Sequence, residues 1–321
     1  MDSKVKTVLI TGATGFIGYF LVKEFIKDYN VICIVRPNSR NLIRLEEFKN
    51  KITLIEHNLK DSYDSIFNKL KNVNLILHAG GNPSSEDSVN NPVPLITDNI
   101  LGTLQVLELS RKLSLDRFFY YAAGESFGPV LKNQDSLETD PYNSLSPYAA
   151  AKAGGEELCT AYSYTYNIPM SITHIANTFG PMSQSNRFPV IAIKKIINDE
   201  ELVIHVDSSK NIGGRRWLYA GDVALHTRFI LDNQKSFCEK WNSAGSTFIT
   251  NLDFAKLIAS ILNKELNYKL KPSERYGHHP YFSNDPIKLY NAGWVEPINM
   301  KGRLEETVNW YKNNSHWLSR A

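Results

Sequence analysis

Tyr148 and Lys152 are the residues whose types and spacing point most directly to chemistry. They lie in the segment 146–152, which reads Ser-Pro-Tyr-Ala-Ala-Ala-Lys, and on a helix a spacing of four residues places both side chains on one face. An ammonium beside a phenol favours the phenolate and lowers the phenol pKa from its ordinary value of about 10, as a general acid/base near neutral pH requires. The same spacing also occurs by chance on amphipathic helices, so the motif needs support from the rest of the chain.

A glycine-rich segment near the N-terminus supplies that support. The β-rich run 5–10 leads into Thr11 to Gly18, and a helical apolar pattern follows. The glycines are spaced Gly-x-x-Gly-x-x-Gly: the first allows a tight turn, the second lets backbone amides approach a pyrophosphate, and the third lets the helix pack on the strand. A turn without a ligand is the alternative, but the order of strand, turn and helix predicts a dinucleotide-binding site.

The end of the second predicted strand indicates which dinucleotide binds. Val31 to Val35 reads as this strand, and Arg36 follows it directly, with Ser39 and Arg40 close behind. An NAD-preferring fold usually carries an acidic residue there to hold the adenosine ribose, whereas a guanidinium suits a ribose phosphate or stacks on adenine. We therefore expect NADP as the favoured cofactor and NAD as the alternative.

Alternating strands and helices predict the fold class. Further strands are expected at Ile52 to Glu56, Val73 to His78 and Phe118 to Ala122, and a long helix is expected from Leu95 to Lys112. This alternation is typical of an α/β protein with a Rossmann-type, doubly wound parallel sheet.

The chain is long enough for two domains. We expect residues 1–175 to form a dinucleotide-binding Rossmann domain and residues 176–321 to form mainly a smaller α/β lobe for the substrate, with an approximate boundary that the chain can cross again. Helices are expected in the second part at Asn251 to Leu262 and at Leu304 to Tyr311.

Composition and charge narrow the class of partner. The chain has 321 residues, 42% of them hydrophobic and 21% charged, and 36 basic against 33 acidic side chains leave a formal charge of only +3. Without a basic run or a long apolar segment, neither nucleic acid nor a membrane is an expected partner. The cysteines lack metal-ligand spacing, which predicts reduced thiols, no metal site and a cytoplasmic protein.

These pieces together resemble the extended short-chain dehydrogenase/reductase family, and within it the nucleotide-sugar epimerases and dehydratases. The resemblance covers nearly the whole chain, and its C-terminal part is similar to the sugar-nucleotide 4,6-dehydratases. In chain order, the segments that carry it are Thr11 to Gly18, His78 to Gly81, Asn99 to Thr103, Glu125 to Gly128, Tyr148 with Lys152, Asn177 to Pro181, Arg215 to Tyr219, Arg275 to His279, Gly293 with Trp294, and Thr307 to Tyr311.

The resemblance implies a reaction on a nucleotide-diphosphate sugar. Tyr148 would remove the hydroxyl proton at sugar carbon 4 while a hydride passes to the bound nicotinamide, and Lys152 would bind the nicotinamide ribose. The resulting 4-keto group makes the proton on carbon 5 acidic, and Glu125 occupies the position of the base that removes it. The alternative for Glu125 is an ordinary solvated carboxylate in a loop.

The same resemblance implies the binding residues and a homodimer. The nucleotide sugar is expected to contact Asn177, Arg187, Arg215 and Arg275, and Arg216 is a further candidate. For both Arg216 and Arg275 the alternative is a surface salt bridge. The expected cofactor contacts are Gly12, Thr14, Gly15, Phe16, Ile17, Gly18, Arg36, Asn58, Leu59, Ala79, Gly80, Gly81, Asn99, Tyr148 and Lys152.

Two departures from the family pattern bear on the reaction. Ala123 stands where relatives place a Ser or Thr that hydrogen-bonds the reacting oxygen, and losing such a donor costs about a hundredfold in rate. Ser126 or a substrate group is then the candidate replacement. Gly124 stands where the 4,6-dehydratases have the Asp that protonates the departing hydroxyl, which argues against a simple 4,6-dehydration.

Three functions follow, of which transient oxidation of a nucleotide sugar is the leading one. The second is a net NADPH-dependent reductase of a 4-keto nucleotide sugar, which Arg36 favours and which needs no elimination acid. The third is a nucleotide-sensing protein that kept the fold and lost activity; Ala123 motivates it, and the intact Tyr148 and Lys152 oppose it. Cofactor turnover separates the two enzymes, because only a reductase consumes nicotinamide.

Overall fold

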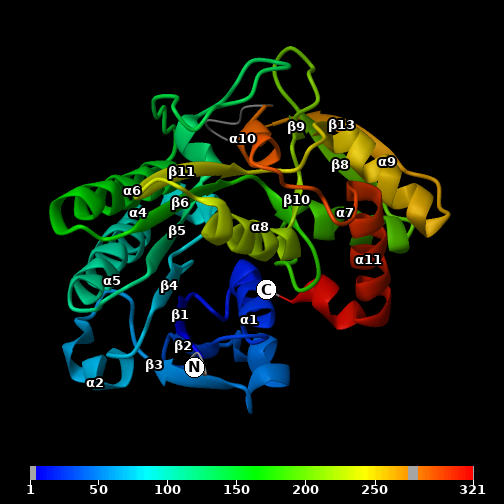
Figure 1. The fold of residues 1–321 in the computed structure, drawn as a ribbon. Helices are drawn as coiled ribbons and strands as arrows, with labels where there is room; N and C mark the ends of the chain where they lie inside the picture. The colour runs from blue at the N-terminus through cyan, green and yellow to red at the C-terminus, as the bar shows by residue number, and fades with distance from the viewer. Residues whose placement is uncertain (1–4, 274–280, 321) are drawn as a thin grey trace. The chain divides into compact units, whose positions relative to one another are not determined.

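The chain divides into two compact units in the structure, a computed structural model that describes residues 5–273 and 281–320 (Figure 1). The first unit comprises the chain up to Gly128 together with Pro141–Ile175 and Gly221–Trp241. The second comprises Pro129–Asp140, Ala176–Ala220 and the chain from Asn242 onward. Each unit is therefore built from segments that are far apart in the sequence.

A seven-stranded sheet forms the centre of the first unit, in the order β11-β6-β5-β4-β1-β2-β3. Strands β1 to β6 pair in parallel, and β1 lies between β2 and β4, with Thr11 opposite both Ile34 and His78. The strand order reverses at β1, which is where open α/β sheets bind their ligands. The strands are β1 (Thr7–Thr11), β2 (Asn30–Val35), β3 (Ile52–Glu56), β4 (Leu75–His78), β5 (Arg117–Ala123), β6 (Met170–Ile175) and β11 (Cys238–Ser243).

Helices cover both faces of this sheet, as the side chains of β5 demonstrate. The Tyr120 hydroxyl donates to the carbonyl of Lys152 in α6 (Pro147–Tyr166), and the Tyr121 hydroxyl lies 2.9 Å from Thr227 in α8 (Ala220–Asn233). Successive strand residues point to opposite faces, so α6 and α8 lie on opposite sides. The other helical segments are α1 (Phe16–Phe25), η1 (Leu42–Phe48), η2 (Tyr63–Ile66), α2 (Phe67–Leu70), α3 (Ser85–Asn90), α4 (Pro92–Ile96), η3 (Thr97–Leu101), α5 (Gly102–Arg111) and η4 (Gly124–Phe127).

The core of the first unit lies between the sheet and these helices. Leu9, Ile76 and Phe118 come from neighbouring strands and are fully buried, and Leu107 of α5 packs in the same cluster. Parallel strands covered on both faces need apolar residues at nearly every position. This is why β1 has the consecutive apolar residues Val-Leu-Ile instead of an alternating pattern.

Helices and short strand pairs make up the described part of the second unit. Strands β7 and β10 pair in parallel, as do β8 and β13, whereas β9 and β12 are antiparallel. Phe254 of α9 and Tyr311 of α11 are fully buried in its core. The elements are β7 (Thr178–Phe179), α7 (Phe188–Ile197), β8 (Leu202–Val206), β9 (Gly214–Arg215), β10 (Leu218–Tyr219), β12 (Ile249–Thr250), α9 (Asn251–Leu262), β13 (Tyr268–Pro272), α10 (Ile287–Asn291), α11 (Met300–Asn313) and η5 (Ser315–Ser319).

Most of the predicted elements are confirmed. The strand Ile52–Glu56 and the helix Asn251–Leu262 have the predicted bounds, and the other predicted strands agree to within two residues. The predicted fold class, an α/β protein with a doubly wound parallel sheet, is confirmed by the strand order and pairing.

The long helix predicted from Leu95 to Lys112 is wrong in one respect, because a π-helical turn interrupts it. The structure has α4, then the π-helical segment η3, then α5. A π turn inserts one extra residue into a helix and is frequent at functional sites. Hydrophobic periodicity does not reveal such an insertion, since the apolar face resumes after it.

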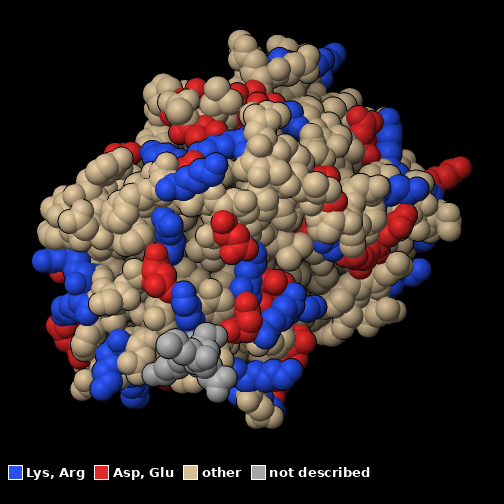
Figure 2. All heavy atoms as spheres, in the orientation of Figure 1, with Lys and Arg blue, Asp and Glu red and all other residues tan. Residues whose placement is uncertain are grey.

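Charged side chains of both signs are exposed on one face of the protein, the face drawn in Figure 2. On the face that Figure 2 displays, basic and acidic side chains lie interspersed, in line with the formal charge of +3. A mixed surface of this kind is more typical of a protein with a small-molecule ligand than of one that binds a polyanion. Within the described ranges, no helix is both long enough and apolar enough to cross a membrane.

Candidate active site

The glycine turn between β1 and α1 forms a close-packed cradle. Gly12 has a φ of 71°, which L side chains rarely adopt, and its carbonyl accepts the amide of Gly15 at 2.8 Å. A Cβ on Gly18 would lie 2.1 Å from the same carbonyl, so a side chain there would force α1 away. Phe16 and Ile17 form the first turn of α1, whose free amides and dipole favour an anion. The cradle therefore fits the pyrophosphate of a dinucleotide.

A buried chain of polar groups holds β1, β4 and α5 together behind this turn. Oγ1 of Thr11 lies 2.7 Å from Nδ1 of His78, whose Nε2 lies 3.0 Å from Oγ1 of Thr103. The amide of Gly80 donates to Thr11 Oγ1 at 3.1 Å. Burial lowers the pKa of His78 to about 3, so the imidazole is neutral and serves as a fixed connector. These contacts define the path of the predicted cofactor-side segment Ala79 to Gly81.

Asn99 lies in the π-helical turn beside this path. Its Oδ1 accepts the amide of Asn82 and its Nδ2 donates to the carbonyl of Asn82, both at 3.1 Å. A Cβ on Gly81 would lie 2.2 Å from Asn99 Oδ1, so the missing side chain lets the two segments meet. Asn99 therefore shapes the loop after β4.

Hydroxyl and guanidinium groups lie close together at the end of the site where the adenosine of the cofactor is predicted to bind. Arg36 follows β2 and is exposed, and Oγ of the buried Ser39 lies 3.4 Å from Oγ1 of Thr14. Sequence reasoning misses Arg44, which is buried and donates to the carbonyl of Thr14 at 3.0 Å. Arg44 adds a positive charge behind the cradle, yet no spacing in the sequence distinguishes it from a surface arginine.

The loop after β3 contributes by packing beside the same segment. A Cβ on Gly80 would lie 2.7 Å from the side chain of Leu59, and one on Gly102 would lie 3.1 Å from it. Asn58, the neighbouring residue, donates from Nδ2 to Asp61 at 3.1 Å. Leu59 thus packs next to the loop after β4, while the side chain of Asn58 bonds within its own loop.

Tyr148 and Lys152 lie on successive turns of α6; Tyr148 is partly exposed and Lys152 is buried. Ser146 caps this helix by accepting a backbone amide at 3.1 Å, and Pro147 occupies its first position. Lys152 is 8% exposed, and burial lowers its pKa to about 8. Its ammonium lies 4.4 Å from the ring centre of Tyr120, a cation–π contact. The helix thus holds a weakly solvated positive charge one turn from the phenol.

Glu125 lies in the turn η4, directly after β5. Its carbonyl accepts the amide of Gly128 at 3.1 Å. The neighbouring Ser126 donates its hydroxyl to the carbonyl of Ala149, which follows Tyr148 in the first turn of α6, at 3.3 Å. The turn that carries Glu125 and the helix that carries Tyr148 are therefore joined directly.

The structure argues against Ser126 as a replacement for the hydroxyl missing at Ala123. Ser126 is fully buried, and the carbonyl of Ala149 accepts the only proton that its hydroxyl carries. Ala123 itself is 6% exposed at the end of β5. A hydroxyl group of the substrate is the remaining candidate for that role.

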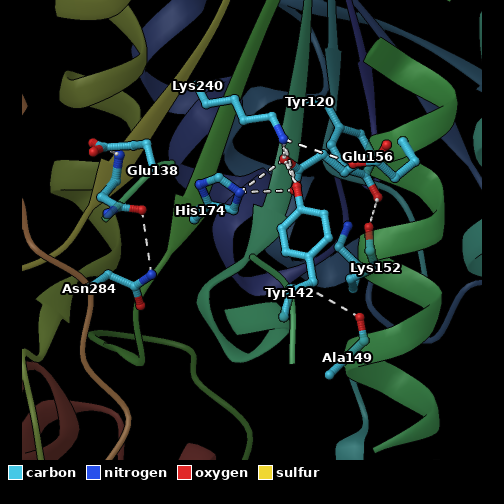
Figure 3. A network of polar contacts seen from close by, with 12 residues as sticks. Tyr120, Glu138, Tyr142, Ala149, Lys152, Glu156, His174, Lys240 and Asn284 are labelled. Carbon is cyan, nitrogen blue, oxygen red and sulfur yellow. Dashed lines mark hydrogen bonds and ion pairs between the residues drawn. The ribbon is translucent and has the colours of Figure 1, made fainter. Parts of the chain in front are cut away.

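A buried carboxylate, Glu156, lies one turn further along α6 and was not among the predicted site residues. It is fully buried and accepts from Nε2 of His174 at 2.9 Å, from the ammonium of Lys240 at 2.9 Å and from the hydroxyl of Tyr142 (Figure 3). Lys240 also donates to the Tyr142 hydroxyl at 2.8 Å. We call these four side chains the Glu156 cluster. They come from α6, β6, β11 and the segment before α6, which no local sequence pattern connects.

The Glu156 cluster is arranged for an ionised carboxylate. Burial opposes the charge, but the hydrogen bond from His174 and the positive charge of Lys240 outweigh it and hold the pKa of Glu156 well below its usual value. Because a carboxylate only accepts, Nε2 of His174 carries the proton; Nδ1 is buried without a hydrogen-bond partner in the part of the chain that the structure describes. With the pKa of Glu156 lowered from 4.5 to about 2 by folding, its stabilising contribution is present above pH 4.5 and is lost as the pH falls through about 2.

The predicted substrate-binding residues that the structure describes lie in the second unit. Asn177 immediately precedes β7, and Arg187 is the N-cap residue immediately before α7. Arg215 lies in β9, with its guanidinium 5.1 Å from the ring centre of Phe282. Arg275 lies outside the described residues.

Arg216 forms a salt bridge, the kind of contact expected as its alternative, although the pair does not lie on the surface; a contact with the substrate stays a prediction. Its Nε and Nη2 donate to the two carboxylate oxygens of Asp135 at 2.9 and 2.8 Å, a bidentate arrangement. Both side chains are mostly buried, at 19% and 18% exposed. The guanidinium of Arg216 is thereby engaged within the second unit.

Comparison with known proteins places the chain among relatives. The sequence profile of the NAD dependent epimerase/dehydratase family matches residues 8–242. The chain is 28% identical to the dTDP-D-glucose 4,6-dehydratase of Dictyostelium discoideum, over 99% of this chain and 84% of that protein. It is 27% identical to the dTDP-glucose 4,6-dehydratase of Salmonella typhimurium, over 98% of this chain and 95% of that protein.

A solved structure supports the same grouping at the level of the fold. The UDP-glucuronic acid 4-epimerase of Bacillus cereus, in complex with UDP-glucuronic acid and NAD, has a TM-score of 0.85 and 23% identity. The match covers 96% of this chain and 99% of that one. The matched range 8–242 contains the glycine turn, Glu125, Tyr148 and Lys152. The chain therefore belongs to the NAD dependent epimerase/dehydratase family, as its resemblance to the extended short-chain dehydrogenases/reductases predicted.

Proposed function

We propose that this protein modifies a nucleotide-diphosphate sugar by transient oxidation at carbon 4 and deprotonation at carbon 5. The observation that carries the proposal is the hydrogen bond from Ser126, in the Glu125 turn, to the carbonyl of Ala149 in the first turn of α6. The same helix carries Tyr148 and the buried Lys152. Sequence relatives named as nucleotide-sugar dehydratases support the class of substrate.

The residues of the chain divide the proton transfers between them. Tyr148 removes the hydroxyl proton at carbon 4, and the ammonium of Lys152 stabilises the phenolate and binds the nicotinamide ribose. When bound, the nicotinamide supplies the oxidation at carbon 4 and its reversal. The keto group makes the carbon 5 proton acidic, and Glu125 removes it. Because Gly124 offers no acid for a departing hydroxyl, return of the proton to carbon 5 is favoured over loss of water.

The two units have different roles in this proposal. The first unit is the dinucleotide-binding domain, with the glycine cradle at the end of β1. The second binds the nucleotide sugar through Asn177, Arg187 and Arg215, and Arg275 is proposed as a further contact. We further propose that the protein works in the cytoplasm as a homodimer.

Cofactor turnover tests the proposed class of reaction. The wild type is incubated with UDP- and dTDP-hexoses and a small amount of oxidised cofactor, and sugar products are followed by NMR together with the absorbance of reduced nicotinamide. We expect many sugar molecules to be converted per cofactor, because the hydride that the cofactor takes from the sugar is returned in the same reaction. Formation of one reduced cofactor per sugar converted, with the reaction stopping when the oxidised cofactor is used up, would instead identify a 4-keto sugar reductase running in reverse.

We also propose that NADP is preferred over NAD, because Arg36 directly follows β2 and is exposed, and a guanidinium there suits a ribose phosphate. Arg36→Ala should then remove most of the preference, since a hydrogen bond to a charged group contributes about 1.5 to 3 kcal/mol, or roughly tenfold to a hundredfold in affinity. Dissociation constants for both cofactors measure this directly. The matched control is Arg111→Ala, an exposed arginine of α5 outside the predicted cofactor contacts. Equal affinities of the wild type for NAD and NADP would refute the assignment.

A further inference from the structure

Tyr142 connects two parts of the candidate site that are separate in the sequence. Its hydroxyl donates to the buried Glu156 of α6. On its other side, the amide of Asn143 donates to the carbonyl of Ser126 at 3.0 Å, and the hydroxyl of Ser144 donates to the same carbonyl at 3.2 Å. The segment 142–144 is thus bonded to α6 at one end and to the Glu125 turn at the other.

The Glu156 cluster also packs directly against the turn that carries Glu125. Phe127, two residues after Glu125, packs its ring against His174 and Tyr142, with ring centres 4.6 and 5.6 Å apart. Phe127 is 5% exposed, so these rings are in close contact inside the unit. A shift of Tyr142 or His174 therefore moves Phe127 and, with it, the turn that carries Glu125.

On α6, the residue that makes this connection is Glu156. Tyr148, Lys152 and Glu156 are spaced by four residues on α6 and lie along one side of it. Glu156 is bonded to three other parts of the unit, because it accepts from β6, from β11 and from the segment before α6. A buried, ionised carboxylate with several donors has few alternative geometries, since every lost partner leaves a charge uncompensated.

We infer that Tyr142 and Glu156 are positioning residues, which hold the Glu125 turn at a fixed place relative to the Tyr148 and Lys152 side chains. This inference rests on the proposed function and deepens it. Oxidation at carbon 4 uses two side chains from α6, whereas deprotonation at carbon 5 uses Glu125 from the turn. Loosening the link between turn and helix therefore impairs the carbon 5 step more than the carbon 4 step. A cluster that merely stabilised the core would affect both steps together.

The variant that tests this is Tyr142→Phe, which deletes the hydroxyl and keeps the ring that packs on Phe127. Its matched control is Tyr162→Phe on α6, which deletes a hydroxyl that donates to Glu108 at 2.6 Å. Backbone amide hydrogen exchange is measured at Gly128 and Asn143, whose amides bond to and across the turn. In Tyr142→Phe we expect these amides to exchange roughly tenfold to a hundredfold faster, the change that loss of one hydrogen bond to a buried carboxylate produces in a local opening.

A second readout follows the two chemical steps separately. In a single turnover in deuterium oxide, cofactor reduction reports oxidation at carbon 4, and label on the sugar reports deprotonation at carbon 5. We expect Tyr142→Phe to lower labelling at least about tenfold relative to cofactor reduction, and Tyr162→Phe to leave the ratio unchanged.

The outcomes separate this inference from the proposed function. Unchanged amide exchange at Gly128 and Asn143 in Tyr142→Phe overturns the inference, whatever the wild type does to a sugar. Equal losses in both chemical steps overturn it too, because they indicate general destabilisation. A wild type that never labels carbon 5 refutes the proposed function alone, and the amide measurement then still decides whether Tyr142 holds the turn.

Discussion

Tyr148→Phe is expected to lower turnover of the true substrate by about a hundredfold to ten-thousandfold, the range that general acid/base catalysis contributes. The substitution deletes only the ionisable hydroxyl, so the affinities for cofactor and nucleotide sugar should stay close to those of the wild type. Steady-state kinetics measure the turnover, and calorimetric titration of each ligand measures the affinities. A loss confined to kcat identifies an interaction made in the transition state.

Lys152→Met is the companion variant, and it should behave differently. Because Lys152 is proposed to bind the nicotinamide ribose as well as to stabilise the phenolate, its loss should weaken cofactor binding in addition to turnover. The ring of Tyr120 beneath it can accommodate the apolar replacement. If Tyr148→Phe turned over at a rate near that of the wild type, Tyr148 would not be the acid/base and the proposed mechanism would fail.

Glu125→Gln should suppress incorporation of solvent deuterium at sugar carbon 5 by about a hundredfold or more, because amide replaces the proposed general base. The same variant should still reduce its cofactor, since oxidation at carbon 4 depends on Tyr148 and Lys152. Mass spectrometry of the sugar and the absorbance of the cofactor in deuterium oxide measure the two steps. The isosteric amide keeps the shape of the turn, so a folded protein is expected.

The labelling pattern of the wild type also separates the types of reaction. Exchange at carbon 5 without release of water agrees with Gly124 in the place of the elimination acid. A carbon 4 epimerase or a reductase would leave carbon 5 unlabelled. Sugar without carbon-bound deuterium, together with stoichiometric consumption of NADPH, would favour the reductase over the proposed function.

The sequence by itself determined the features that depend on residues close together in the chain. The apolar run of β1 and the glycine turn after it predict a strand, a tight turn and a helix, because each follows from local backbone chemistry. The start of α6 is equally local, since Ser146 caps the helix and Pro147 suits its first position. Tyr148 and Lys152 then share a face through helical spacing alone.

Only the tertiary structure decided which groups meet across the fold. Arg44 lies behind the cradle, Arg216 pairs with Asp135, and a π turn directs Asn99 to the loop after β4. Each depends on contacts between segments that are at least 17 residues apart. Such partners are selected by the sheet and helix packing, so the sequence alone does not show which groups these side chains contact.

The charges on α6 illustrate the physical reason most directly. Lys152 and Glu156 are four residues apart, a spacing that predicts an ion pair along the helix. In the structure Lys152 instead lies over the ring of Tyr120, and Glu156 pairs with Lys240 of β11 and accepts from its other partners in the cluster. Inside a buried, weakly polar environment a charge is held by whichever donors or rings surround it closely. Helical spacing put both side chains on α6, but the strands packed beside that helix determined their partners.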